Sequence, residues 1–435
     1  MELLTATFLG FIGGLLVGLL PGFGTTSFLI ISFPFVLDQS LLFCIVFYCV
    51  LSSVSQYFGS VTTLSFGIPG ENTSLPLLGI RDELIKTDKI SETYFLCAYG
   101  SLLASVISGL LILFFTNVFS HITFYLKSYI SLTCAALGIF LCILYSNNKL
   151  HMSIIFIVVG WIVGKIGYDE IYNENFLTFN NVYLYSGIPT LPAIMGIYAV
   201  PNIFNTFYEL KNLTISTYKH KILCNKFTLA ILHTNVVIRS TLVGFVSGLI
   251  PYIGNGISSY LAFLIEKKYN PNNFTAQATS AESANNAANL SVLIPLVLLG
   301  VAIVPSEFVL LEIILSSNKI VSWKSLLESV YLISLCLLIA NLIAFILSWN
   351  MLKATHFIIH KLKSWFLILT LLFILFTVYI VGFQYSQGLY YLCILSFFSI
   401  IGFLLRKYDL LPFVYAFLLQ NNIEQILYRI HKIYL

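Results

Sequence analysis

The sequence predicts an all-α polytopic membrane protein, built from two structural repeats that contain broken or re-entrant helices. Three observations lead to this fold class. Of the 435 residues, 58% are hydrophobic and only 9% are charged, whereas a soluble domain carries about 25% charged residues. Many apolar runs approach the roughly 20 residues that a helix needs to cross a ~30 Å hydrocarbon core. Finally, a pattern of glycines and a proline recurs in both halves of the chain.

The N-terminal half consists of uncharged apolar runs separated by polar stretches. The first charged loop, residues 81–89, follows the third run, and the glycine- and proline-marked stretch 164–189 reads as an irregular connection. The expected membrane segments of this half span residues 3–20, 28–37, 41–65, 94–115, 129–145, 152–163 and 191–204.

The C-terminal half follows a basic stretch, Lys211–Lys221. Its expected segments span residues 236–265, 291–304, 308–315 and 326–349, with two more inside 365–405. By the length of a spanning helix, the two halves together hold about ten to twelve membrane segments. We therefore divide the chain into an N-terminal membrane repeat (1–210), a basic inter-repeat linker (211–235) and a C-terminal membrane repeat (236–435).

The strongest sign of a repeat is a pair of helix breaks. The run Gly14–Gly24 aligns with Gly244–Gly254 at a constant offset of 230 residues, and three glycines, a leucine and a proline coincide. Broken backbone at membrane depth persists only where protein or a wet cavity satisfies its polar groups. Paired breaks of this kind mark the binding site of many transporters. The alternative is close helix packing with a proline kink.

Glu282 is the most informative ionisable residue, because three side-chain amides follow it. Asn285, Asn286 and Asn289 share one helical face with it at i+3, i+4 and i+7. A carboxylate with three amides in a cavity is suited to binding a cation or to hydrogen-bonding a substrate, and intramembrane ionisable groups are usually functional. The alternative is an exposed polar loop between two apolar segments.

Other polar residues lie close to the breaks. Ser and Thr at 25–27, 60, 62–63 and 65 are able to bind a carboxylate through their hydroxyls, or simply to pack helix against helix. Glu71 and Glu307 follow a second pair of proline breaks. They either guard a cavity mouth or cap a helix start, where a carboxylate complements the helix dipole.

Several function classes lack their signatures. The sequence contains no HExxH, GxSxG or P-loop motif, so we expect neither an enzyme nor an ATP-driven pump, and no catalytic residues. The eight cysteines show no paired spacing, so we expect no metal site, disulfide framework or cofactor. The net charge of +4 lies mainly in loops and gives no indication of nucleic-acid binding. Because Glu2 and no basic residue precedes the first apolar run, we expect no cleaved secretory signal.

Taken in order, these motifs resemble the large membrane subunit of the tripartite tricarboxylate transporters, the TctA permease family. The resemblance covers nearly the whole chain. The similar elements are Leu20-Pro-Gly-Phe-Gly24, Ile250-Pro-Tyr-Ile-Gly254, Tyr57-Phe-Gly-Ser60, Ile68-Pro-Gly70, Ala281-Glu-Ser-Ala-Asn-Asn-Ala287, Gly167-Tyr-Asp169, Phe176-Leu-Thr-Phe179 and Ile401-Gly-Phe-Leu-Leu-Arg-Lys-Tyr408.

The chain departs from the family pattern at three places. Tyr252 stands where the second break has a glycine, Asn180 replaces another glycine, and Val304-Pro-Ser-Glu307 differs from the usual Gly-Ile-Pro-Gly-Ser. We expect Tyr252 to narrow or reshape a site at the second break.

The resemblance implies cation-coupled uptake of a small carboxylate, such as a tricarboxylate or dicarboxylate, with sodium as the expected coupling ion. It also implies a small membrane subunit and a periplasmic solute-binding protein as partners, and a multi-pass location in the bilayer of the bacterial cytoplasmic (inner) membrane. The alternatives are a stand-alone carboxylate carrier without a binding protein and a degenerate, non-transporting membrane scaffold.

Within this reading, the two breaks frame the substrate site and the amide-bearing face completes it. Glu282 and Asn289 are the expected ion-coupling residues. The expected substrate-binding residues are Pro21, Gly22, Gly24, Thr25, Thr26, Ser60, Thr62, Thr63, Pro251, Gly254, Asn255, Asn285 and Asn286.

Overall fold

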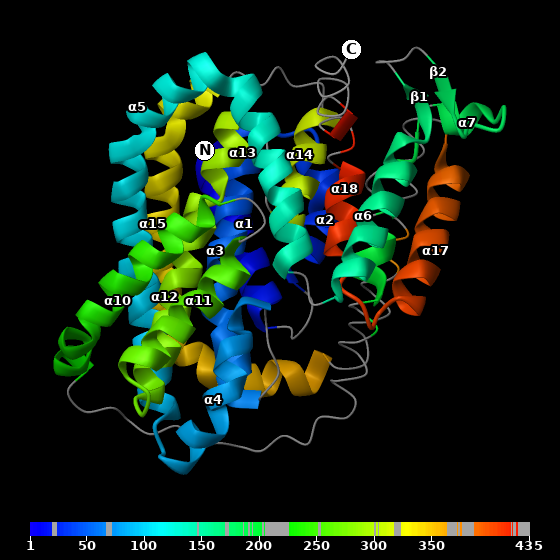
Figure 1. The fold of residues 1–435 in the computed structure, drawn as a ribbon. Coiled ribbons are helices and arrows are strands. Elements are labelled where there is room, and N and C mark those ends of the chain that lie inside the picture. The colour runs from blue at the N-terminus through cyan, green and yellow to red at the C-terminus, as the bar shows by residue number, and fades with distance from the viewer. Residues whose placement is uncertain are drawn as a thin grey trace.

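The structure is a computed structural model of the chain (Figure 1). Nearly all of what it describes is helical. It describes residues 1–19, 24–66, 72–145, 148–169, 174–185, 187–189, 192–193, 195–201, 204, 226–250, 254–299, 302, 304–316, 323–362, 372, 375, 387–418, 420 and 423–424.

The helices follow one another with short connections. In the first half they are α1 (Glu2–Leu19), α2 (Gly24–Val36), α3 (Leu41–Phe66), the 3₁₀ turn η1 (Asn72–Ser74), α4 (Leu75–Lys86), α5 (Ile90–Tyr145), α6 (Leu150–Lys165), α7 (Val182–Tyr185) and the π-helical turn η2 (Met195–Ala199). In the second half they are α10 (Lys226–Gly248), α11 (Gly254–Tyr269), α12 (Phe274–Ser291), α13 (Leu293–Leu299), α14 (Pro305–Ser316), α15 (Trp323–Leu362), α17 (Gly388–Leu404) and α18 (Leu411–Leu418).

The predicted fold class, an all-α multi-pass membrane protein, is confirmed. Within the described part of the chain, five helical stretches are long and apolar enough to cross a membrane: Glu2–Leu19, Leu41–Leu64, Ile90–Phe114, Thr228–Gly248 and Ser329–Ser348. Three shorter apolar helices, α2, α6 and α17, accompany them. The expected total of ten to twelve segments stays a prediction.

Three elements differ from the expectation. The segments 94–115 and 129–145 belong to one helix, α5, which rises along one side of the molecule, bends and descends again (Figure 1). Helix α10 begins at Lys226, inside the range assigned to the linker, because the apolar run there contains no breaker. The irregular stretch 164–189 contains a small antiparallel pair, β1 (Gly167–Asp169) with β2 (Glu174–Phe176), in the register Tyr168↔Asn175.

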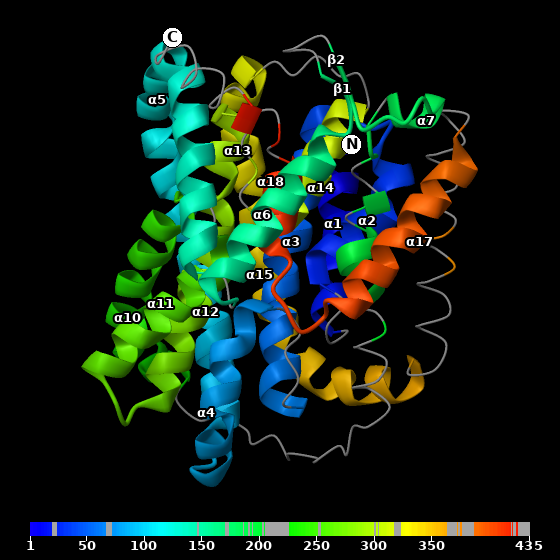
Figure 2. The same ribbon diagram turned by 45° about the vertical axis from the view of Figure 1, so that its right-hand side comes forward.

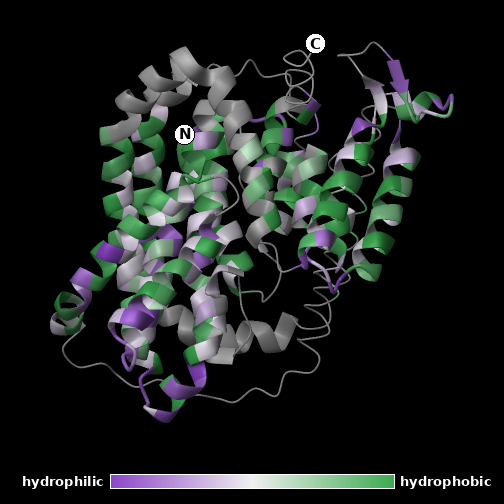
Figure 3. Cartoon of the chain, in the orientation of Figure 1, coloured by the Kyte–Doolittle hydropathy of each residue, from purple (hydrophilic) through white to green (hydrophobic). Residues whose placement is uncertain are grey.

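Helices α3 and α12 occupy the interior of the bundle. Helix α3 is 89% buried over its apolar window, whereas α1 and α10 are each 39% buried over theirs. Helix α3 packs on α1 and α15, and α12 packs on α10, α11 and α5. Figures 1 and 2 show these helices grouped together, with α6, α17 and the β pair on the other side of the molecule. Polar residues gather at the end near α4 and the α11–α12 turn (Figure 3).

Glycines set the closest helix contacts, and they do so in the same way in both halves. A Cβ added at Gly14 or Gly18 would collide with α3 backbone at Leu51 and Ser55. In the second half, a Cβ at Gly244 would collide with the backbone of Ala284, and one at Gly248 with Ala288 and Ser291. Small residues of this kind let membrane helices approach closely. Helix α1 therefore stands to α3 as α10 stands to α12.

The helix breaks also match. Helix α1 ends at Leu19 and α2 starts at Gly24, while α10 ends at Gly248 and α11 starts at Gly254. Gly24 and Gly254 have φ of +65° and +54°, a left-handed conformation that glycine adopts without the cost of a Cβ. The coinciding glycines of the sequence pattern thus begin equivalent helices.

Candidate functional site

The centre of the candidate site is helix α12, whose polar face is buried. Every residue from Thr275 to Ser291 is buried, so the exposed-loop alternative for this stretch is wrong. Glu282 and Asn285 have no exposed surface, and Asn289 is only 3% exposed. Burying a polar group is unfavourable unless it is hydrogen-bonded, and burying a charge is more so. The partners of these side chains therefore decide what the face can do.

Asn286 and Asn289 connect α12 to neighbouring helices. The Asn289 Oδ1 accepts a hydrogen bond from Ser52 Oγ on α3 at 2.6 Å. The Asn286 Nδ2 donates to Ser101 Oγ on α5 at 2.8 Å and to the carbonyl oxygen of Glu282 at 3.1 Å. Both amides thus take part in packing α12 between helices from the other half of the chain.

A second group of polar atoms has no such partner. Among the described residues, both carboxylate oxygens of Glu282, both amide atoms of Asn285 and the Asn286 Oδ1 make no hydrogen bond of ordinary geometry. On the facing helices, the same holds for Gln56 Oε1 on α3 and Asn341 Nδ2 on α15. Each buried group left without a partner costs about 1–3 kcal/mol. A cluster of them indicates a place that something outside the chain completes.

The surroundings of Glu282 are otherwise uncharged. Asn285 is its polar neighbour on the same helix, and Tyr94 and Cys97 of α5 lie within electrostatic range of it. The Tyr94 hydroxyl donates to the carbonyl oxygen of Ser348 at 2.9 Å, which ties α5 to α15. The carboxylate is therefore enclosed by neutral groups that do not offset a negative charge.

The first helix break places hydroxyls against α3. Pro21 and Gly22 lie outside the described residues. Gly24 begins α2, the buried Thr25 Oγ1 lies 3.2 Å from Ser55 Oγ, and Thr26 is half-buried. The break thus brings the start of α2 to the helix that also carries Ser52 and Gln56.

The second break is arranged similarly. Pro251 and Tyr252 lie outside the described residues, so the expectation for Tyr252 stays a prediction. Gly254 is buried and Asn255 half-buried at the start of α11. The Ser258 Oγ donates to the Gly254 carbonyl oxygen, which fixes the first turn of α11.

The predicted hydroxyl set on α3 lies apart from the amides. Ser60 lies two turns beyond Ser52, roughly 12 Å along the helix. Ser60, Thr62 and Thr63 are buried, and their hydroxyls donate to backbone carbonyls at Tyr57 or Gly59 within 2.8–2.9 Å. In this state they serve helix packing, the alternative that the sequence had left open.

The carboxylates beside the second pair of breaks separate as well. Glu71 lies outside the described residues. Glu307 is fully buried in the first turn of α14, where its Oε2 accepts a hydrogen bond from the Val304 backbone N–H at 3.3 Å. This contact favours the helix-capping role.

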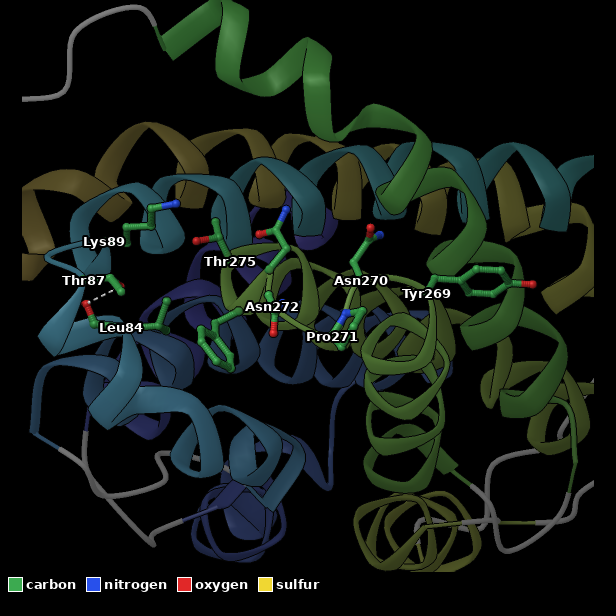
Figure 4. Close-up of a pocket in the computed structure, with 10 residues that line it drawn as sticks. Leu84, Thr87, Lys89, Tyr269, Asn270, Pro271, Asn272 and Thr275 are labelled. Carbon is green, nitrogen blue, oxygen red and sulfur yellow. Dashed lines mark hydrogen bonds between the residues drawn. The ribbon is translucent and has the colours of Figure 1, made fainter.

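A pocket of about 460 Å³ opens at the polar end of the bundle. It lies between the α4–α5 turn and the α11–α12 turn (Figure 4), and Thr275, in the first turn of α12, belongs to its wall. Its lining residues are Leu84, Thr87, Lys89, Tyr269, Asn270, Pro271, Asn272, Asn273, Phe274 and Thr275. None of the predicted site residues lines it; Glu282 lies two helical turns further along α12, roughly 10 Å away.

Sequence reasoning found one side of this cluster and missed the other. Gln56 and Asn341 face α12 from helices distant in sequence, and Ser53 Oγ on α3 donates to Asn341 Oδ1 at 2.8 Å. A signal existed for both. Ser52-Ser-Val-Ser-Gln56 is a polar run in an otherwise apolar segment, and Asn341 is a single amide in another.

Comparison with known proteins gave two matches. The family model described as the tripartite tricarboxylate transporter TctA family matches residues 4–415. A protein of Agrobacterium vitis, named the uncharacterized 52.8 kDa protein in the TAR-I ttuC' 3' region, is 25% identical over 352 residues, which are 77% of this chain and 70% of that protein. No solved structure matches the chain.

Proposed function

The chain belongs to the TctA family of tripartite tricarboxylate transporters, and on that premise we propose that it is the large permease subunit of a secondary transporter for small carboxylates. Its substrates would be tricarboxylates or dicarboxylates, and sodium would be the coupling ion. The location that fits is the bacterial cytoplasmic (inner) membrane, with a small membrane subunit and a periplasmic solute-binding protein as partners.

The buried polar cluster between α3 and α12 is the observation that carries this proposal. A scaffold without transport activity gains nothing from fully buried, unpartnered groups such as Glu282 and Asn285, because they lower the stability of the folded chain. A transporter needs such groups, since an ion or substrate satisfies them only while it is bound. The cluster therefore favours a transporter over the scaffold.

The two helix breaks are suited to the substrate. Helices α2 and α11 begin at Gly24 and Gly254 in the bundle, and free N–H groups at a helix N-terminus favour a negative charge. In this proposal the carboxylate groups of the substrate bind near Thr25, Thr26 and Asn255, and the α12 amides complete the site. Pro21, Gly22 and Pro251 would shape the same two turns.

We place the two repeats at residues 1–210 and 236–435, joined by 211–235. The matched glycine contacts of α1 with α3 and of α10 with α12 support this division. So does the packing of α5 on α12 and of α15 on α3, because it makes each half contribute a wall to the polar cluster of the other.

The outer surface of the bundle fits a lipid bilayer and a membrane partner. Helices α1, α10 and α15 expose large apolar side chains, among them Phe8, Leu232 and Ile346. Contiguous apolar surface of this kind is unfavourable in water. Lipid and the small membrane subunit would cover it.

The test is uptake of a labelled panel of dicarboxylates and tricarboxylates into cells that express this chain, with and without candidate small subunits and binding proteins. The proposal predicts sodium-dependent uptake of at least one carboxylate that requires a binding protein. Uptake that needs no partner would favour a stand-alone carrier. No uptake of any carboxylate by a correctly inserted chain with its partners would refute the proposal.

A further inference from the structure

The glycine contacts give a residue-by-residue correspondence between α3 and α12. Gly14 meets Leu51 where Gly244 meets Ala284, and Gly18 meets Ser55 where Gly248 meets Ala288. Leu51 and Ser55 on α3 thus correspond to Ala284 and Ala288 on α12. One position further along, Ser52 corresponds to Asn285 and Gln56 to Asn289.

An independent hydrogen-bond pair obeys the same correspondence. Ser53 of α3 bonds to Asn341 of α15, and its counterpart on α12, Asn286, bonds to Ser101 of α5. Each bond joins the central helix of one half to a helix of the other half. The two halves are therefore related by an approximate twofold exchange, in which a contact on one side has a mate on the other.

One such mate is missing. Ser52 donates to Asn289 at 2.6 Å, and the twofold exchange turns this pair into Asn285 with Gln56. Both amide atoms of Asn285 and the Oε1 of Gln56 make no hydrogen bond, although the two side chains are 0% and 3% exposed. The pair is closed on one side of the exchange and open on the other.

The open side alone carries a charge. Glu282 lies one turn before Asn285 and Asn286 on the same face of α12, with no hydrogen-bond partner for either oxygen. The residue that corresponds to Glu282 on α3 is Cys49, a buried free thiol. The asymmetry in hydrogen bonding therefore coincides with an asymmetry in charge.

We infer that the open pair is the binding site of one monovalent metal cation. Its ligands are the Glu282 carboxylate and the side-chain oxygens of Asn285 and Gln56, with the Asn286 Oδ1 nearby. Oxygen ligands suit hard cations, and one carboxylate among neutral amides supplies the single negative charge that a sodium ion balances. Asn289, expected as an ion-coupling residue, serves instead to hold α12 against Ser52.

This inference deepens the proposed function, because it assigns the site of the coupling ion and allows one ion at this position. Binding of the ion is nevertheless measurable without transport. The experiment is a sodium titration of the purified chain in detergent or nanodiscs, read out by melting temperature and by equilibrium binding of ²²Na⁺. Choline replaces sodium at constant ionic strength.

The wild-type chain is expected to bind ²²Na⁺ saturably and to melt at higher temperature in sodium than in choline. Glu282→Gln abolishes both effects. Asn285→Ala and Gln56→Ala each weaken binding by about tenfold or more, the loss expected for one ligand bound to a charged group. Gln56→Glu keeps an oxygen ligand and retains sodium binding. Glu83→Gln, which changes a surface carboxylate, leaves binding unchanged.

Two results would overturn the inference. One is a wild-type chain whose stability responds to pH but not to sodium, which would mean that Glu282 binds a proton only. The other is a folded Glu282→Gln variant that binds ²²Na⁺ as the wild type does. Sodium binding without carboxylate uptake would leave this site intact and refute the proposed function, whereas sodium-coupled uptake that survives in Glu282→Gln would do the reverse.

Discussion

At the scale of single residues, Asn285 and Asn289 differ in one respect that decides their roles. Both are buried amides on the same face of α12, and both were expected to contribute to a site. Asn289 has a partner within the chain, Ser52, whereas Asn285 has none. A buried group with a partner stabilises the fold, and a buried group without one destabilises it until a ligand arrives. The same truncation should therefore have opposite consequences at the two positions.

We predict that Asn289→Ala lowers the free energy of unfolding by about 1 kcal/mol, because the Ser52 hydroxyl loses its acceptor. Asn285→Ala, measured in choline without sodium, should leave stability unchanged or raise it, because it removes unsatisfied atoms. Denaturant or thermal unfolding of the two purified variants checks this. Equal losses would contradict the assignment of distinct roles.

At the scale of elements, the sequence was informative about breaks and poor about lengths. The glycine and proline pattern predicted the ends of α1 and α10 and the starts of α2 and α11, because local backbone conformation depends on those residues. It did not predict that α5 continues through residues 116–128, where polar side chains resemble a loop. Helix α12 was ambiguous for the same reason, since its polar composition shows burial only after its neighbours are known.

The close contact of α10 with α12 makes Gly244 sensitive to a single methyl group. We predict that Gly244→Ala lowers the free energy of unfolding by about 1–3 kcal/mol, because its Cβ meets the backbone of Ala284. Gly109→Ala is the matched control: no atom lies within 4 Å of an added Cβ there, and alanine favours a helix by about 0.5–1 kcal/mol. The two melting temperatures give the comparison, and a Gly244→Ala variant as stable as the control would contradict the packing described.

A buried ion pair holds α6 to the segment after α18. Lys165 Nζ lies 3.0 Å from Glu424 Oε1, with the two side chains 16% and 2% exposed, and Trp161 Nε1 donates to the same oxygen at 3.0 Å. We predict that Glu424→Ala costs about 3–5 kcal/mol of stability, since it leaves a poorly exposed lysine without its partner. Glu83→Ala, which removes the exposed pair with Lys86, should cost less than about 1 kcal/mol. Comparable losses in thermal unfolding would show that the Lys165 pair is not buried as described.

At the scale of the whole molecule, the polar cluster depends on both halves of the chain. Helix α12 supplies Glu282 and its amides, α3 supplies Gln56, and α15 supplies Asn341. The sequence predicted the α12 side because helical spacing brings nearby residues together. It could not predict the other side, because contacts between positions hundreds of residues apart depend on how the helices cross. Pairing of Ser53 with Asn341 and of Asn286 with Ser101 becomes visible only in the fold.

The central claim is that sodium bound at Glu282 drives carboxylate uptake through this chain. The most direct test is uptake of a labelled carboxylate by proteoliposomes that contain the chain and its small subunit, with the binding protein added outside and an inward sodium gradient imposed. We predict gradient-driven accumulation by the wild type and its loss in Glu282→Gln, with Glu83→Gln as active as the wild type. Equal accumulation by Glu282→Gln, or equal uptake with and without the sodium gradient, would contradict the account.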